Sequence, residues 1–96
     1  DVAPRVVNLE SAGFPLLGGR LDYVQGHTAA TLVYGRRRHI VNLFMWPNAD
    51  GDRTTKASYH GYALLHWQAS GMTYWAVSDA SAAELDAFRD AYSLAP

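Results

Sequence analysis

The stretch HGYALLHWQASGMTYWAVSD, residues 60–79, predicts two antiparallel strands joined by a tight turn at Ala69–Ser70–Gly71. Because side chains alternate along a strand, Tyr62, Leu64 and His66 share one face of the first strand, and Ala63, Leu65 and Trp67 share the other. A strand with one wet side normally alternates apolar with polar residues, yet both faces here carry large apolar or aromatic side chains. Either both faces are covered, or one face is kept for a partner.

Three further strands are expected upstream. RLDYV at 20–24, HTAATLVYG at 27–35 and HIVNLFMWP at 39–47 are alternating or rich in β-branched and aromatic residues, with turns expected at Gln25–Gly26 and at the basic run 36–38. Pro47 suits a strand end, since it has no backbone N–H for a ladder. Residues 48–58, NADGDRTTKAS, are polar and predict one long loop, with its sharpest turn at Asp50–Gly51.

Both ends of the chain carry helical signals. Asn8 is expected to cap a short helical turn, NLESA, that Gly13 ends in a left-handed conformation. Near the C-terminus, Ser81 and Glu84 have the capping-box spacing. An apolar stripe at helical spacing follows them: Leu85, Phe88 and Tyr92.

These elements predict a single α+β domain over residues 1–96. The expected architecture is an antiparallel meander of about five strands, packed by one C-terminal helix, with a short N-terminal helical turn. One helix covers only one face of such a sheet, and we expect that face to carry Leu65, Trp67, Trp75 and Val77.

The opposite face is then the candidate interaction face, made of Tyr62, Leu64, His66 and Tyr74. It is covered by the N-terminal segment, or it is available for binding. A free strand edge beside it offers a second way to bind a peptide or protein.

Composition narrows the function classes. The formal net charge is −1, from eight basic and nine acidic residues. This balance gives no long-range attraction for nucleic acid, so the basic cluster GRRRH at 35–39 is interpreted as a charged turn. The absence of cysteine excludes disulfides and thiolate chemistry. No apolar run approaches the ~18 residues that a membrane span needs.

No motif for chemistry stands out, and we expect no catalytic residue, metal or cofactor. His60 and His66 lie roughly 20 Å apart along one strand, no nucleophile elbow is present, and the pair Gly18–Gly19 does not complete a phosphate loop. Two alternatives stay open. One is a small-molecule-binding domain with an aromatic pocket between helix and sheet; the other is a hydrolase or metal enzyme that uses His66 and Asp79.

Four motifs occur in order along the chain: GGRLDY at 18–23, RRRHIVNLFMWP at 36–47, GYALLHW at 61–67, and YWAVSD at 74–79 followed by EL at 84–85. In this combination, from about Val7 to Phe88, the chain resembles the extracytoplasmic domain of bacterial transmembrane anti-sigma factors. The resemblance implies no catalytic residues. It implies fold-keeping roles for the matched glycines and tryptophans: Gly18, Gly19, Trp46, Trp67 and Trp75.

The resemblance also implies an arrangement in the cell. In such proteins a cytoplasmic N-terminal segment, often a small zinc-binding helical unit, holds a sigma factor inactive, one transmembrane helix follows, and the outer domain senses or transmits a signal in the periplasm. The sigma-binding segment and the membrane span are missing from this sequence, as is a strand-length segment that relatives carry upstream. We therefore expect a periplasmic fragment of an inner-membrane protein. Its expected partner is a protein or a stress signal, with self-association left open.

Overall fold

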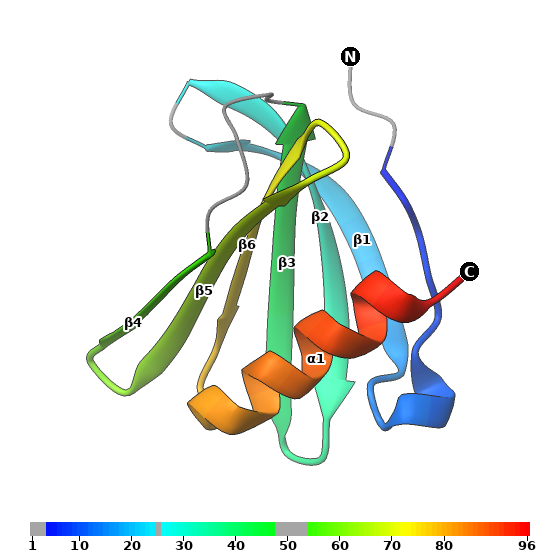
Figure 1. Cartoon of the computed structure of the whole chain (residues 1–96), viewed down its shortest axis with the longest axis vertical. Coiled ribbons are helices and arrows are strands. Elements are labelled where there is room, and N and C mark those ends of the chain that lie inside the picture. The colour runs from blue at the N-terminus through cyan, green and yellow to red at the C-terminus, as the bar shows by residue number, and fades with distance from the viewer. Residues whose placement is uncertain (1–3, 25, 48–53) are drawn as a thin grey trace.

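The computed structural model describes residues 4–24, 26–47 and 54–96. Within these ranges six strands form one antiparallel sheet, and a single α-helix lies across one face of it (Figure 1). The strands are β1 (Leu16–Val24), β2 (His27–Arg36), β3 (His39–Pro47), β4 (Thr54–Tyr59), β5 (Tyr62–Ala69) and β6 (Met72–Ser78). The helix is α1 (Ala82–Leu94), and a short 3-10 turn, η1, spans Glu10–Ala12. The α+β class is confirmed.

The sheet order is β1-β2-β3-β6-β5-β4, so the expected simple meander is wrong, and the sheet has six strands, close to the expected number of about five. Two three-stranded meanders join where β6 pairs with β3, and the chain therefore crosses from β3 to the far edge before it returns. Thr54–Tyr59 form the additional strand, and all of it but Tyr59 falls in the stretch 48–58 that is expected to be a loop. All six residues of β4 are exposed, so no apolar alternation marks this strand in the sequence. The expected turn at Asp50–Gly51 lies outside the described residues.

Two of the hairpins turn on two residues with positive φ. They are His60–Gly61, with φ of 50° and 83°, and Ser70–Gly71, with φ of 53° and 76°. Such left-handed pairs match the twist of the flanking strands. The second turn sets Ala69 opposite Met72 and thereby fixes which residues of β5 and β6 share a face.

The helix begins and packs as its sequence predicts. The Ser81 hydroxyl accepts a hydrogen bond from the Glu84 backbone N–H at 3.1 Å. The apolar stripe is buried against the sheet, and its members are Leu85, Phe88 and Tyr92. The sheet residues that meet it include Tyr34, Leu43, Met45, Leu65 and Trp67. We call this side of the sheet the inner face and the opposite side the outer face.

The short helical turn near the N-terminus is also confirmed. The N-cap residue is Leu9 rather than the expected Asn8, whose side chain accepts a hydrogen bond from the Glu10 backbone N–H at 3.0 Å. Gly13 ends the turn with φ of 88°. Phe14 pairs with Leu9 in an isolated bridge and meets the ring of Phe88 edge to face, 5.3 Å between centroids. The turn therefore seals one end of the core.

Residues 4–8, here called the N-terminal segment, run extended beside the C-terminal end of α1 (Figure 1). The Tyr34 hydroxyl donates a hydrogen bond to the Val7 carbonyl oxygen at 2.6 Å, and the Tyr92 hydroxyl donates one to the Arg5 carbonyl oxygen at 2.7 Å. Because Tyr34 and Tyr92 belong to the core under the helix, this segment covers the inner side of the domain. No helix in the described part of the chain is long and apolar enough to cross a membrane.

Candidate interaction face

A row of ring side chains crosses the centre of the outer face. Phe44 of β3 lies opposite Trp75 of β6, and Trp75 lies opposite His66 of β5. The rings of His66 and Trp75 stack, with centroids 4.4 Å apart and an interplanar angle of 16°. All three side chains are half-buried. We call these three residues the aromatic row.

The row continues into an apolar surface toward the turn between β4 and β5. Leu64 lies opposite Val77, and both are half-buried. Tyr62 lies opposite Tyr59, and their side chains are 51% and 67% exposed. The structure thus brings Tyr62, Leu64 and His66 to the outer face. No helix of the described chain covers this face.

Tyr74, the fourth residue of the candidate face, lies on the inner face instead. It is 5% exposed, its ring stacks on Trp67 at 5.1 Å, and it meets Tyr92 of the helix edge to face at 5.6 Å. Trp75 and Val77 are expected on the helix side, but both lie on the outer face, opposite His66 and Leu64. The error comes from the turn, which has two residues rather than the expected three, because a change of one residue moves every side chain of a strand to the other face.

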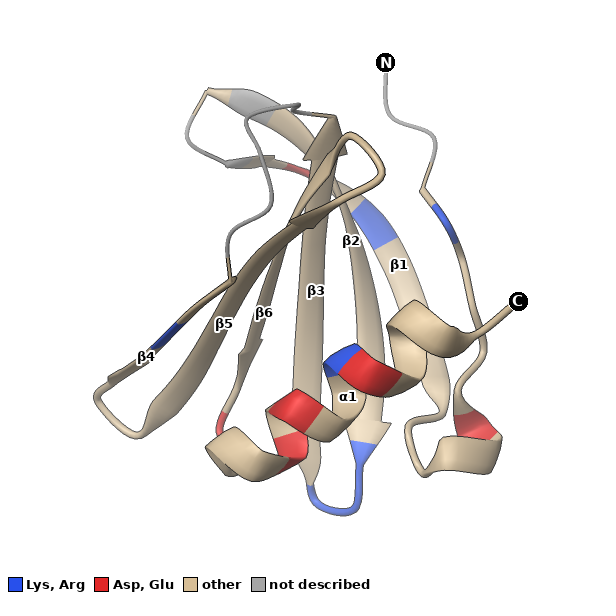
Figure 2. Cartoon of the chain, in the orientation of Figure 1, with Lys and Arg blue, Asp and Glu red and all other residues tan. Residues whose placement is uncertain are grey.

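Charged side chains gather away from the centre of the sheet, on α1, on the turns and on the edge strands (Figure 2). On the outer face, the charged pair Arg20 and Asp22 lies on β1, where the Asp22 carboxylate accepts hydrogen bonds from Arg20 and from Thr31, both at 2.8 Å. The aromatic row therefore occupies an uncharged region flanked by a polar edge. This arrangement is typical of a protein-binding surface with an apolar centre and a polar rim.

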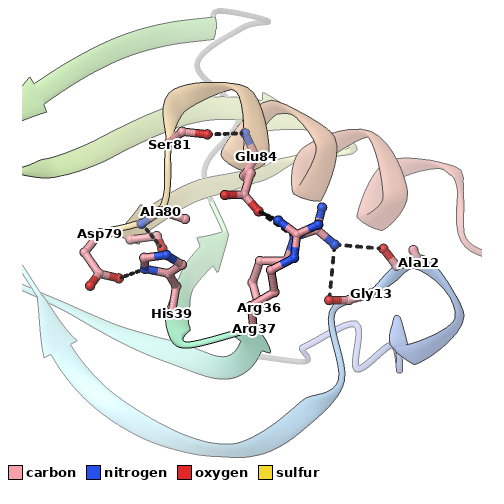
Figure 3. A network of polar contacts seen from close by, with 10 residues as sticks. Ala12, Gly13, Arg36, Arg37, His39, Asp79, Ala80, Ser81 and Glu84 are labelled. Carbon is pink, nitrogen blue, oxygen red and sulfur yellow. Dashed lines mark hydrogen bonds and ion pairs between the residues drawn. The ribbon is translucent and has the colours of Figure 1, made fainter.

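The basic turn between β2 and β3 is tied to the start of α1 (Figure 3). Arg36 Nε donates to Glu84 Oε2 at 2.7 Å, and Arg37 lies 3.5 Å from the same oxygen. The Arg36 hydrogen bond holds the pKa of the Glu84 carboxyl below its usual value. The Arg36 guanidinium also lies over the Phe14 ring and reaches the carbonyl oxygens of η1. Arg36 thus joins the turn, the helix and η1.

The geometry does not assemble the pair His66 and Asp79 that a hydrolase or metal enzyme would use. Instead, Asp79 Oδ1 lies within hydrogen-bonding distance of His39 Nδ1, at 3.0 Å (Figure 3). It follows Ser78, whose partner on β5 is Ala63, about 10 Å along that strand from His66. Among residues 4–24, 26–47 and 54–96, no group of three or more His, Asp or Glu side chains is arranged to hold a metal ion.

A pocket of about 210 Å³ lies between the C-terminal end of α1, the N-terminal segment and the turn between β5 and β6. Its lining includes Arg5, Trp67, Ser70, Tyr74, Tyr92 and Ser93. Three of the lining residues, Trp67, Tyr74 and Tyr92, are core aromatic side chains from the sheet and the helix. Sequence reasoning missed Arg5, since nothing in its neighbours Pro4 and Val6 marks it as a pocket residue.

Comparison of the chain with family models, with curated proteins and with solved structures found no match in any of the three. The function is therefore argued from the outer face, the pocket and the four motifs.

Proposed function

We propose that this chain is the periplasmic interaction domain of a membrane-anchored anti-sigma factor, and that its outer face binds a protein whose docking controls release of the sigma factor. The observation that carries the proposal is the aromatic row on a sheet face that α1 does not cover. The row is half-buried and continues into the exposed rings of Tyr59 and Tyr62, and exposed apolar patches mark interaction sites in many proteins. The sigma factor itself would be bound by a segment outside this chain.

The motifs behind the resemblance support the same surface. Phe44 belongs to RRRHIVNLFMWP, His66 to GYALLHW and Trp75 to YWAVSD, so three of the four motifs each supply one member of the aromatic row. The resemblance itself implies a fold-keeping role for Trp75, so the binding role of the row is argued from its position on the outer face.

The free edge at β4 offers the partner a second contact. β4 pairs with β5 on one side, and in the described chain no strand pairs with its other side. At the other end of the sheet, the register of β1 is broken between Leu16 and Gly18. An extended segment added to β4 would gain backbone hydrogen bonds and would lie beside Tyr59, with Tyr62 one strand further in.

The test uses the intact gene product in its host. Tyr59 and Tyr62 are replaced together by Ser, and transcription from the promoters of the cognate sigma factor is measured with and without envelope stress. We expect the stress response to change severalfold, because the partner loses two ring contacts. The matched control is Tyr23→Ser, which removes a ring that is 77% exposed on β1, far from the aromatic row.

An unchanged stress response in a folded Tyr59→Ser/Tyr62→Ser protein would contradict docking at this surface. The location is tested separately by fusing, after Pro96, a reporter enzyme that is active only outside the cytoplasm. An inactive reporter on a full-length, membrane-bound fusion would contradict the periplasmic assignment.

A second candidate function is binding of a small molecule, which the 210 Å³ pocket favours. Pockets with aromatic walls and a few polar groups are the usual ligand sites of small domains. A ligand present at 100 times its dissociation constant would raise the free energy of unfolding by about 2.7 kcal/mol. Thermal unfolding of the purified domain against small compounds measures this effect directly.

A further inference from the structure

The pocket contains a cation that has no carboxylate partner. Arg5 is half-buried, and its guanidinium donates to the carbonyl oxygens of Tyr92, at 2.7 Å, and of Ala95. Across the described ranges, no Asp or Glu forms an ion pair with Arg5. Arg36 and Lys56, in contrast, each have a carboxylate within 2.8 Å.

The two carbonyl oxygens offset only part of the charge on Arg5. They belong to the C-terminal end of α1, where the aligned backbone dipoles are equivalent to about −0.5 of an elementary charge. A guanidinium has five N–H donors, and two are used in these contacts. The charge is therefore only partly offset, and three of the five donors are not used in these two contacts.

Three aromatic side chains also line the pocket: Trp67, Tyr74 and Tyr92. The rings of Trp67 and Tyr74 stack at 5.1 Å, and the Tyr92 ring lies 4.8 Å below the Arg5 guanidinium. The Ser70 and Ser93 side chains contribute hydroxyl groups from the turn and from the helix. A bound molecule would thus meet both aromatic rings and a cation.

The volume limits the size of that molecule. An apolar cavity of about 150 Å³ accommodates benzene, and pockets for drug-sized ligands begin near 300 Å³. A pocket of about 210 Å³ therefore suits one six-membered ring, or a branched alkyl group, with a small polar substituent.

We propose that this pocket binds small apolar monocarboxylates, with the carboxylate on Arg5 and the ring or alkyl group against Trp67, Tyr74 and Tyr92. The inference rests on the second candidate function, small-molecule binding. A carboxylate accepts two parallel hydrogen bonds from a guanidinium, an arrangement stronger and more directional than a neutral hydrogen bond. A peptide that ends in an aromatic residue carries the same two groups at its C-terminus, a carboxylate and a ring.

The test compares phenylacetate with phenylacetamide, a neutral molecule of nearly the same shape, by calorimetry and thermal unfolding of the domain. We expect phenylacetate to bind at least tenfold more tightly. A short peptide ending in Phe, with its C-terminus free or amidated, distinguishes a peptide source from a free acid, since a pocket closed to chain atoms binds only the small acid.

Variants tie the binding to the residues. Arg5→Gln is expected to remove the preference for the acid, and Arg5→Lys to keep part of it, because the charge stays. Ser93→Trp fills the pocket from an exposed helix position and is expected to abolish binding of both molecules. Its matched control, Ala87→Trp, lies on the same helix at an exposed position that does not line the pocket and leaves binding unchanged.

Each failure has a distinct meaning. Equal affinity for phenylacetate and phenylacetamide would overturn the carboxylate proposal while the pocket remained a small-molecule site. No binding of any probe at 10 mM, on the order of the weakest fragment affinities, would overturn both. If Arg5→Gln does not fold, Ser93→Trp and the acid-to-amide ratio of the unmodified domain still decide the outcome.

Discussion

Arg5 and Tyr92 form two reciprocal hydrogen bonds, each from the side chain of one residue to the backbone of the other. The Tyr92 hydroxyl donates to the Arg5 carbonyl oxygen at 2.7 Å, and the Arg5 guanidinium donates to the Tyr92 carbonyl oxygen, also at 2.7 Å. The two residues are 87 apart in the chain, so this reciprocal contact closes the N-terminal segment onto the last helix. One wall of the pocket therefore depends on a few hydrogen bonds.

Removing the Tyr92 hydroxyl is expected to loosen the N-terminal segment without opening the core. Tyr92→Phe keeps the buried ring and leaves the Arg5 carbonyl oxygen without its donor, which costs about 1–2 kcal/mol of unfolding free energy. Urea unfolding measures the loss, and amide hydrogen exchange should speed up in residues 4–8 but not in β3 or β6. Tyr34→Phe, which removes the bond to Val7, should give the same pattern. Uniform acceleration of exchange across the domain would contradict a local role.

The same two tyrosines predict a loss of stability in alkali. Burial raises the pKa of Tyr34 and of Tyr92 above the usual value near 10. The unfolded chain therefore releases these protons at about pH 10 while the folded chain keeps them. Their contribution is complete below pH 10 and falls as the pH rises toward the folded pKa, by up to about 1.4 kcal/mol per pH unit for each tyrosine. Urea unfolding between pH 9 and pH 11 measures the slope, and the double variant Tyr34→Phe/Tyr92→Phe should flatten it.

A complementary effect is expected in acid from the contact between Arg36 and Glu84. Because the folded pKa of Glu84 lies below its unfolded value near 4.5, the stability it contributes is present above pH 4.5 and is lost as the pH falls through the folded pKa. Glu84→Gln should lower the melting temperature at pH 7, and the gap from the unmodified domain should close at low pH. The control is Asp90→Asn, in the exposed pair with Arg89, which should leave the melting temperature unchanged both at pH 7 and at low pH. A gap that persists at pH 2.5 would show that the charge is not responsible.

Gly13 is expected to be less replaceable than other glycines with positive φ. An added Cβ at Gly13 would clash with Arg36 Nη1, whereas at Gly71 it would meet no atom within 4 Å. Both substitutions to Ala strain the backbone by about 1–2 kcal/mol, but only Gly13→Ala also displaces the guanidinium from Glu84 and Phe14. We expect a further cost of about 1–2 kcal/mol. In an Arg36→Met background the two costs should become equal, which a double-mutant cycle measures.

The elements that the sequence predicts well are those whose signals are local. Ser81 and the stripe of Leu85, Phe88 and Tyr92 specify a helix within one short segment, and Gly13 marks the end of η1 by its own conformation. The pairing of β3 with β6 has no such signal, because it is set by which strands bury their apolar faces together. β4 was missed because a fully exposed edge strand is stabilised by its backbone ladder with β5 rather than by apolar side chains.

Which residues of β6 belong to the candidate face depends on the length of the turn at Ser70–Gly71. Alternation along β5 placed Tyr62, Leu64 and His66 on one side correctly, since it needs no knowledge of the partner strand. Assigning the faces of β6 requires the register between β5 and β6. A three-residue turn would shift this register by one residue relative to the two-residue turn of the structure. Tyr74 and Trp75 consequently exchanged faces, and no property of either side chain reveals which of them meets the helix.

This exchange makes a last prediction about stability. Tyr74→Ser removes a ring packed between Trp67 and Tyr92, and the resulting cavity should cost about 3 kcal/mol or more. Tyr62→Ser, at a side chain that is 51% exposed, should change the unfolding free energy by no more than about 0.5 kcal/mol. Chemical denaturation of the two variants measures both values. If Tyr74→Ser were as mild as Tyr62→Ser, Tyr74 would not lie under the helix, and the register that assigns Trp75 to the outer face would be wrong.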